Sequence, residues 1–199
     1  MKRVLVACEF SGVVRDAFRE RGFEAWSCDL EGVEPEGKWP NYHLYGDVRW
    51  FLDSPYEWDL MISHPPCTHL AVSGARYFAE KIADGRQQRA LDFVRALLDA
   101  PVPHIALENP ISVISTKIRK PDQIIQPWQF GHGETKATCL WLKNLPKLRP
   151  TDIVGGREAR VWRMAPGPDR WKERSRTPQG VANAMAEQWG GWLEAESVL

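Results

Sequence analysis

Polar and reactive residues follow short apolar runs repeatedly within the first 110 residues, and this alternation restricts the chain to few folds. The apolar runs are typical of buried strands, and segments with helical spacing separate them. Strands that alternate with helices predict an α/β sheet of parallel strands with crossover helices, and ligands bind such sheets at the carboxyl ends of the strands. The strand ends carry Glu9-Phe10-Ser11-Gly12, Asp29, Gly46-Asp47, Pro65-Pro66-Cys67 and Glu108-Asn109.

The pattern also predicts where the elements lie. The run 4–7 predicts the first strand, and Val14, Ala17 and Phe18 follow it at helical spacing until Gly22 ends the helix. Further strands are expected at 25–28, around 44–45, and at 58–63, 105–107 and 139–142, and further helices at 90–98 and 181–192.

Length and charge balance exclude several classes of protein. A chain of 199 residues with a hydrophobic fraction of 43% can bury one sizeable core, so we expect a single domain over 1–199, with a short basic insert at about 143–176. Lys plus Arg and Asp plus Glu number 26 each, so no global basic field draws the protein to nucleic acid. Any contact with nucleic acid must therefore be local.

The N-terminal apolar run and the cysteines indicate a cytoplasmic protein. The run that begins the chain is too short for a signal peptide or a membrane span. The four cysteines, Cys8, Cys28, Cys67 and Cys139, form no C-x-x-C pair, which argues against a disulfide framework and against a Cys-rich zinc site.

Two features at the first strand ends are typical of an adenosine-type cofactor. A turn with Gly12 lets the backbone approach a ligand, and a carboxylate such as Asp29, at the end of the second strand, is where a nucleoside ribose is usually held. The motif Phe10-Ser11-Gly12 lacks the full G-x-G-x-x-G, so a plain tight turn explains it equally well. Asp29 and Asp47 are equally candidates for ordinary helix caps or turn formers.

Cys67 is the candidate nucleophile. A thiol that follows two prolines at a strand end is expected on a kinked, exposed loop, whereas most lone cysteines are buried and inert. Glu108, at the end of another strand, is the candidate acid on the substrate side.

A zinc site is the rival interpretation of the same loop. His64, Cys67 and His69 form H-x-x-C-x-H, but three ligands on one proline-kinked loop rarely close a tetrahedral site, and a fourth, such as His132, is remote in sequence. We therefore expect no metal.

The order of these segments resembles the DNA cytosine-5 methyltransferase family, whose members use S-adenosylmethionine. The resemblance runs from the first strand to Pro110 and implies a Rossmann-like methyltransferase fold. It implies that Pro66-Cys67 belongs to the nucleophile loop and Leu107-Glu108-Asn109 to the acid motif. The implied cofactor-binding residues are Phe10, Ser11, Gly12, Asp29, Asp47, Val48 and Pro66.

The resemblance also implies a mechanism. A Cys67 thiolate adds to C6 of cytosine, Glu108 relieves the resulting charge at N3, and Asn109 orders the loop. Lys136 occupies the position of one arginine in the family's glutamine-arginine-arginine segment. The nucleophile loop departs from the family, because Thr68 replaces the usual glutamine and Ala71 a serine.

The family's large target-recognition domain is missing, which is typical of a compact, phage-like member acting in the host cytoplasm. The basic insert, with Trp162 and Trp171 among its arginines, is the candidate DNA-binding segment, and a solvated basic surface is the alternative. A partner subunit could supply target recognition. Within the basic insert of this chain, the candidate nucleic-acid-binding residues are Arg170, Lys172 and Arg174.

Two further functions stay open at this point. The same chemistry could act on a free deoxycytidine nucleotide or carry a modified one-carbon group. A catalytically idle protein that binds nucleic acid or a partner is the rival from another class, and the presence of Cys67 and Glu108 argues against it.

Overall fold

A seven-stranded sheet forms the centre of the protein, in a computed structural model that describes residues 1–34, 37–52, 57–165, 167–168 and 170–196. The strands lie in the order β3-β2-β1-β4-β5-β7-β6, and β1 to β5 are parallel to one another. Their bounds are β1 Arg3–Ala7, β2 Glu24–Asp29, β3 His43–Tyr45, β4 Leu60–Ser63, β5 His104–Pro110, β6 Gln123–Ile125 and β7 Thr138–Lys143.

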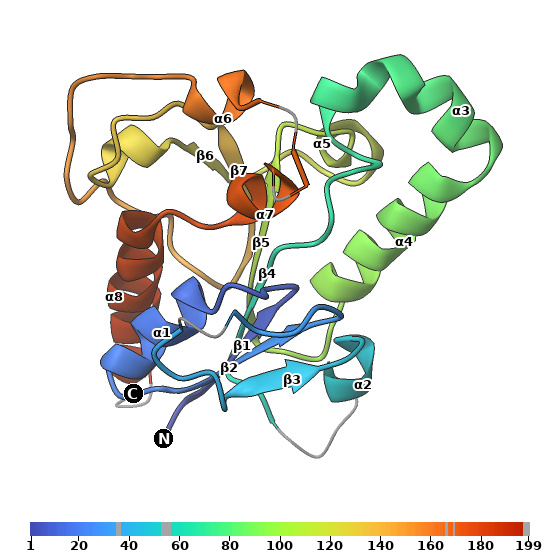
Figure 1. Cartoon of the computed structure of the whole chain (residues 1–199). Helices are drawn as coiled ribbons and strands as arrows, with labels where there is room; N and C mark the ends of the chain where they lie inside the picture. Colours follow the sequence, from blue (N-terminus) through green and yellow to red (C-terminus); the bar gives the residue numbers. More distant parts are fainter. Residues whose placement is uncertain (35–36, 53–56, 166, 169, 197–199) are drawn as a thin grey trace.

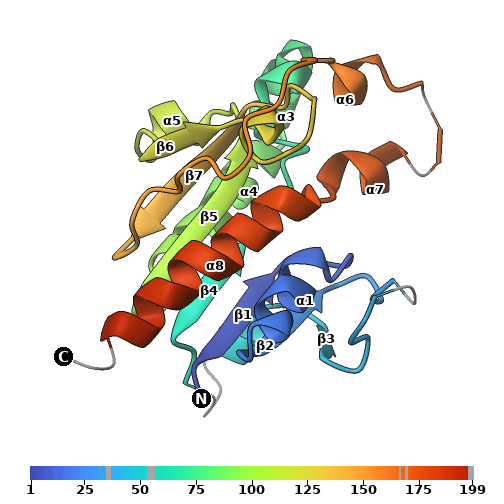
Figure 2. The ribbon, with the colours of Figure 1, turned by 90° about the vertical axis from the view of Figure 1, so that its left-hand side faces the viewer.

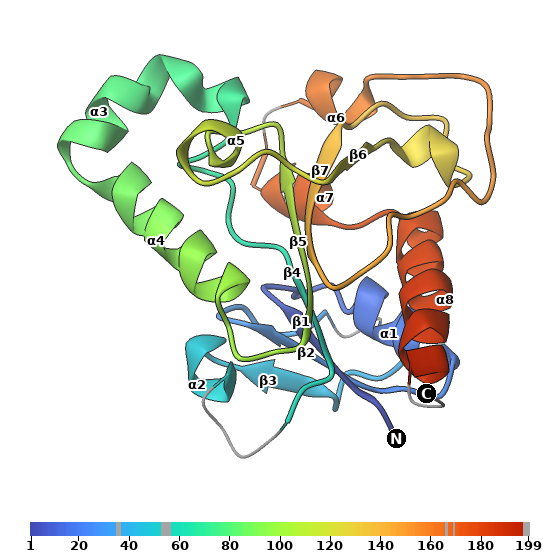
Figure 3. The ribbon, with the colours of Figure 1, turned by 180° about the vertical axis from the view of Figure 1, so that it is seen from behind.

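Helices cover both faces of this sheet, giving three layers (Figure 1). Helices α1 and α8 lie on one face and α4 on the other, as the view from behind also shows (Figure 3). No helix in the described ranges is long and apolar enough to cross a membrane. The helices are α1 Val13–Glu20, α2 Arg49–Leu52, α3 Phe78–Ala83, α4 Arg86–Leu98, α5 Ile114–Lys117, α6 Arg160–Arg163, α7 Arg170–Ser175 and α8 Gln179–Glu196.

The apolar run of β1 is continuous because the strand is buried on both sides. Val4 and Val6 face the layer of α1 and α8, where they join Phe18 and Trp189. Leu5 and Ala7 face the opposite layer. Successive side chains of a strand point to opposite faces, so a central strand needs apolar residues at every position.

The expectation of parallel strands is wrong for the last part of the sheet. Strand β7 runs antiparallel to β5, with Glu108 opposite Leu140 and Asn109 opposite Cys139. Strand β6 pairs antiparallel with the far side of β7. Because of this reversal, the start of β7 lies at the edge where β5 ends, which brings Lys136 and Thr138 to the carboxyl edge of the sheet.

Strand order locates the binding edge. From β1 the chain proceeds through β2 and β3 toward one side, and from β4 it proceeds toward the other. Crevices form at the carboxyl ends of the strands at such a switch point, here between β1 and β4. The loops that follow β1 and β4 therefore border the expected site.

The start of α8 packs too closely for any side chain at Gly180. A Cβ there would lie 1.8 Å from the Phe130 carbonyl oxygen, which is backbone and cannot turn away. We expect Gly180→Ala to lower the free energy of unfolding by about 1–3 kcal/mol.

Gly191, in the same helix, provides the matched control for that substitution. A Cβ at Gly191 meets nothing within 4 Å, so Gly191→Ala should be neutral or stabilising by up to about 1 kcal/mol. Urea denaturation of both variants measures the contrast, and equal effects would show that the contact with Phe130 is not tight.

Candidate active site

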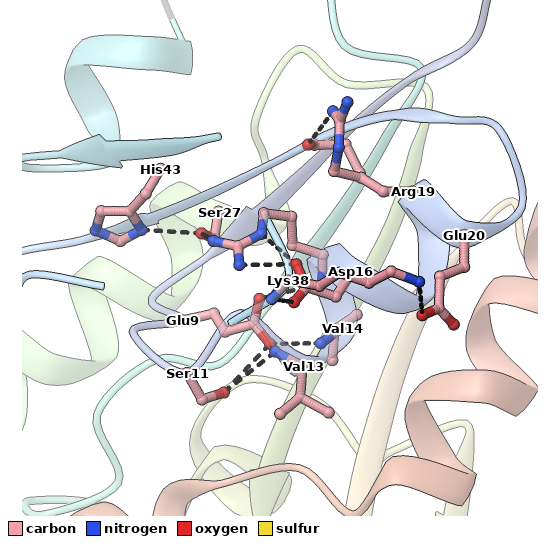
Figure 4. A network of polar contacts seen from close by, with 12 residues as sticks. Glu9, Ser11, Val13, Val14, Asp16, Arg19, Glu20, Ser27, Lys38 and His43 are labelled. Carbon is pink, nitrogen blue, oxygen red and sulfur yellow. Dashed lines mark hydrogen bonds and ion pairs between the residues drawn. The ribbon is translucent and has the colours of Figure 1, made fainter. Parts of the chain in front are cut away.

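The loop after β1 is built around a buried carboxylate. Glu9 accepts hydrogen bonds from the backbone N–H groups of Val14, at 2.7 Å, and of Arg15, at 3.2 Å (Figure 4). It therefore caps the N-terminus of α1, a role that its place beside the expected cofactor loop did not reveal. Burial raises the pKa of the Glu9 carboxyl, while the charge of His64 acts to lower it.

Gly12 gives this loop its shape. Its φ of 71° lies in the left-handed region, which glycine adopts without strain. A Cβ on Gly12 would also meet the Arg15 guanidinium, which lies beneath the turn. Phe10 is nearly buried, and its ring lies 5.4 Å from that of Trp171 in α7. Ser11 is also buried and lies 3.5 Å from Glu9.

A buried arginine supports the loop from below, and sequence reasoning missed it. Arg15 is fully buried, with Nε 2.7 Å from an oxygen of Asp16 and Nη1 2.9 Å from Ser27 Oγ. His43 contacts the same hydroxyl at 2.8 Å, and the backbone N–H of Lys38 donates to Asp16 at 2.8 Å. The network joins α1 to β2, to β3 and to the loop between these two strands. Its sequence signal is weak, because charged residues in a short helix normally face solvent.

The two aspartates expected on the cofactor side differ in their surroundings. Asp29 ends β2, where its carboxylate accepts the backbone N–H of Glu31 at 2.9 Å, and burial raises its pKa. Asp47 is held by Arg49, whose guanidinium contacts both carboxylate oxygens and lowers the pKa of Asp47. Val48, beside Asp47, is buried. A backbone N–H thus contacts the carboxylate of Asp29, whereas a cation holds the carboxylate of Asp47.

The loop after β4 carries Cys67 and is tied to the end of β5. The side-chain amide of Asn109 donates to the Pro65 carbonyl at 2.8 Å, and the backbone N–H groups of Leu70 and Ala71 donate to the Cys67 carbonyl, both at 2.9 Å. Pro65 is buried and Pro66 is exposed. These contacts fix the direction in which the loop leaves the sheet.

Cys67 is half-buried, so the expectation of an exposed thiol is only partly met. Burial raises the pKa of the Cys67 thiol, and the nearby Glu108 carboxylate raises it further. The cations Lys136 and Arg174 act in the opposite direction. The structure therefore brings Cys67, Glu108 and Lys136 together, from the loop after β4, the end of β5 and the approach to β7.

Glu108 lies at the centre of this group. Burial alone would raise its pKa, but a hydrogen bond from His64 at 3.2 Å and the charges of Lys136 and His64 outweigh burial and lower it. Lys136 donates from Nζ to the backbone carbonyl of Arg174 at 2.8 Å. A cavity of about 10 Å³ lies between Glu108, Lys136 and Thr138, room for about one water.

The basic insert covers the site instead of projecting away from it. Helix α7 lies beyond the start of α8 in Figures 1 and 2. Trp171 packs on Phe10, Arg174 approaches Lys136, and Arg176 pairs with Glu34 at 2.7 Å. None of the residues Arg170–Ser175 of α7 is fully buried, so the helix lies at the surface while contacting the site through Trp171 and the backbone of Arg174. The side chain of Trp162 lies outside the described part. Arg170 and Lys172 are partly buried in α7.

His64 belongs to the site by its contact with Glu108. Its Nδ1 lies 3.2 Å from Glu108. Among the described residues, no group of three His, Cys, Asp or Glu side chains is arranged to hold a metal ion. Sequence reasoning considered His64 for zinc alone, because the contact with Glu108 joins positions 44 residues apart.

Comparisons with known proteins address the fold. No protein-family model matches the chain, and no curated protein matches its sequence. A solved structure from E. coli, of a protein assigned as a DNA modification methyltransferase encoded within a prophage, matches with a TM-score of 0.50 and 14% identity, over 83% of this chain and 56% of that one. The chain thus spans little more than half the length of that protein.

Two further solved structures show weaker similarity. The Entamoeba histolytica methyltransferase EhMeth matches with a TM-score of 0.46 and 16% identity, over 77% of this chain and 58% of that one. A mutant of Spodoptera frugiperda DNMT2 matches with a TM-score of 0.41 and 15% identity, over 78% and 55%.

The strand order and the E. coli match define the class of fold. The protein has the Rossmann-like α/β fold of S-adenosylmethionine-dependent methyltransferases. This confirms the α/β class expected from the alternation of strands and helices and the Rossmann-like methyltransferase fold implied by the family resemblance. The similarity to these structures is one of fold, so the chemistry is argued below from the residues of this chain.

Proposed function

We propose that this protein transfers the methyl group of S-adenosylmethionine to C5 of cytosine in DNA, with Cys67 as the nucleophile. The observation that carries the proposal is the convergence of Cys67, Glu108 and Lys136 at the switch-point edge of a methyltransferase fold. A thiol, a carboxyl and a cation at one point supply the groups that addition to a pyrimidine ring requires.

The residues at this edge fit the cofactor. S-adenosylmethionine, when bound, supplies an electrophilic methyl group on a sulfonium sulfur. The Gly12 turn leaves backbone close to the edge, and Asp29 presents a carboxylate for a ribose. Asp47 would contact the cofactor while its carboxylate stays paired with Arg49. The residues assigned to cofactor binding are Phe10, Ser11, Gly12, Asp29, Asp47, Val48 and Pro66.

The chemistry follows from the reactivity of cytosine. C5 is a poor nucleophile, so a Cys67 thiolate first forms a bond to C6 and the ring electrons move toward N3 and C5. A proton from Glu108 neutralises the charge at N3. After C5 gains the methyl group, a base removes its proton, and breaking the bond between sulfur and C6 restores the double bond and the thiolate.

DNA is the proposed substrate for two reasons. Lys136 at the site donates to the backbone carbonyl of Arg174 in α7, and this helix also carries Arg170 and Lys172, cations that a phosphate backbone could contact. The similar prophage protein is described as a DNA modification enzyme. Since the described part of 144–178 holds two short helices, α6 and α7, a partner subunit is the proposed source of target recognition.

Radiolabelled S-adenosylmethionine tests this function directly. The protein is incubated separately with duplex DNA, single-stranded DNA and deoxycytidine nucleotides, and label is counted in each substrate. Incorporation into DNA supports the proposal. Incorporation into the free nucleotide alone would assign the same chemistry to a different substrate, and no incorporation anywhere would favour an idle binding protein.

Replacing the ribose acid should weaken cofactor binding. We expect Asp29→Asn to reduce affinity for S-adenosylmethionine by roughly 10- to 150-fold, because each hydrogen bond to a charged group contributes about 1.5–3 kcal/mol. Calorimetry measures the change, and Asp99→Asn, at the exposed end of α4, is the control. Equal affinity of Asp29→Asn and wild type would remove Asp29 from the cofactor site.

The basic side chains of α7 should set the salt dependence of DNA binding. Replacing Arg170, Lys172 and Arg174 together with Gln should weaken binding to all sequences and reduce the salt slope by up to about 3. Binding is the proper measurement, because Arg174 also influences the pKa of Cys67 and so affects turnover.

A second triple variant controls for the loss of three charges. Arg89, Lys117 and Lys120 are exposed residues outside α7, and their replacement with Gln changes the net charge by the same amount. The control triple should leave the slope nearly unchanged. Identical slopes for the two triple variants would exclude α7 from the DNA interface.

A further inference from the structure

His64 occupies a buried position between two carboxylates at the active-site edge. Its side chain is 9% exposed, and Nδ1 lies 3.2 Å from Oε2 of Glu108, itself 16% exposed. On the other side, its charge influences the buried carboxyl of Glu9. Within the described part of the chain, the buried Nε2 has no hydrogen-bond partner. An imidazole placed in this way can carry a proton between buried groups.

The position of His64 is fixed by the sheet. His64 follows β4 directly, and its backbone N–H donates to the carbonyl of Ala7 at 2.9 Å. Ser63, the last residue of β4, pairs with Leu107 of β5, so the next residues along the two segments, His64 and Glu108, lie side by side. The ring of His64 therefore meets Glu108 through strand register, not through flexible loops.

We propose that His64 is the positioning residue that stores the proton which Glu108 delivers to N3 of cytosine. The inference rests on the proposed function and adds to it the source of the proton. As the bond between Cys67 sulfur and C6 forms, a proton passes from Nδ1 of the His64 imidazolium to the Glu108 carboxylate and from that carboxyl to N3.

The charges balance in this step. The thiolate brings one negative charge into the ring, and the proton that leaves the imidazolium cancels it. His64 becomes neutral, and Glu108 returns to its carboxylate form. When C5 has lost its proton and the thiolate departs, the proton on N3 returns along the same path to His64. No oxidant, metal or further reactant is required.

The groups around His64 favour this role. Glu9 approaches His64 from the loop after β1 and Glu108 from β5, so the imidazole faces carboxylates from two elements. The cations Arg15, in α1, and Lys136, near the start of β7, act on the same two carboxylates. A hydrogen bond from His64 helps to lower the pKa of Glu108, so Glu108 is a carboxylate at neutral pH. It can protonate N3 only if another group first gives it a proton.

The substitution His64→Gln separates proton storage from hydrogen bonding. Its amide can still donate to Glu108, but it cannot hold a proton. We expect kcat for methyl transfer to DNA to fall by about 10²-fold, with KM for DNA and cofactor affinity nearly unchanged. The descending limb of the pH profile of kcat should move to lower pH, because Glu108 alone must then carry the proton.

His69→Gln is the matched control, since His69 lies on the same loop five residues further on. It should keep the wild-type profile. If His64→Gln retains wild-type kcat and the wild-type profile, or loses rate equally at every pH, the proposal is overturned. A merely structural role would produce the second of these results.

Nuclear magnetic resonance of ¹⁵N-labelled histidine tests the pair without relying on turnover. The ring signals of His64 at neutral pH should differ between the wild type and Glu108→Gln, because Nδ1 lies 3.2 Å from the Glu108 carboxylate and that substitution replaces its charge. Coincident spectra would contradict the coupling. Absence of methyl transfer by the wild type would instead contradict the proposed function, and the resonance experiment would still decide whether the pair exists.

Discussion

Cys67→Ser should abolish methyl transfer while leaving the affinity for S-adenosylmethionine nearly unchanged. A serine hydroxyl is far less nucleophilic than a thiolate toward C6, and removing a nucleophile lowers turnover by at least about 10⁴-fold. Because the pKa of the Cys67 thiol is raised by burial and by Glu108, alkylation of the wild-type thiol by iodoacetamide should accelerate from neutral toward alkaline pH. Single-turnover kinetics measures the loss.

Cys28→Ser is the matched control for that substitution. Cys28 lies buried in β2, where its thiol contacts the Gly46 carbonyl at 3.5 Å, and a serine hydroxyl can donate to the same oxygen. It should retain activity. DNA containing 5-fluorocytosine should trap a covalent adduct on Cys67, because fluorine cannot leave as the proton does. A fully active Cys67→Ser protein would contradict the mechanism.

Glu108→Gln should lower turnover and at the same time make the Cys67 thiol more reactive. An amide cannot supply a proton to N3, so methyl transfer should fall by about 10²- to 10⁴-fold. The same substitution removes the negative charge that raises the pKa of Cys67, so iodoacetamide should alkylate Cys67 at lower pH than in the wild type. A more reactive thiol in a slower enzyme is the expected combination.

Glu187→Gln, an exposed substitution in α8 that breaks a surface pair with Arg21, is the control for Glu108→Gln. It should leave turnover and alkylation unchanged. If Glu108→Gln slowed alkylation of Cys67, the carboxylate would be activating the thiol, and its role as acid at N3 would be wrong.

The local sequence pattern was sufficient to predict the central strands of the sheet and the main helices that cover it. Strand β1 and helix α4 lie where their apolar residues predict them, because burial of an apolar run or stripe is a local property of the sequence. Strand β6 was missed. It has three residues, too few for a periodic signal, and it forms because β7 offers a free edge.

The direction of β7 was also beyond local reasoning. A strand of six residues carries no mark of whether it runs parallel or antiparallel to its neighbour. The chain from 111 to 137 decides this, because it passes through α5 and β6 and returns to the carboxyl edge before β7 begins. Lys136 owes its place beside Cys67 to that path.

At the site, residues near strand ends were predictable and their partners were not. Cys67 and Glu108 follow from the rule that parallel strands share a carboxyl edge. The cap formed by Glu9 and the pairing of His64 with Glu108 depend on side chains from different elements. Such contacts have no sequence spacing of their own, so a structure is needed to find them.

The identity of the methylated nucleoside tests the central claim most directly. Duplex DNA is incubated with the protein and S-adenosylmethionine that carries a deuterated methyl group, digested to nucleosides and analysed by mass spectrometry. The account predicts labelled 5-methyl-2′-deoxycytidine from the wild type and none from Cys67→Ser. Label in N4-methylcytosine or N6-methyladenine, with Cys67→Ser as active as the wild type, would contradict it.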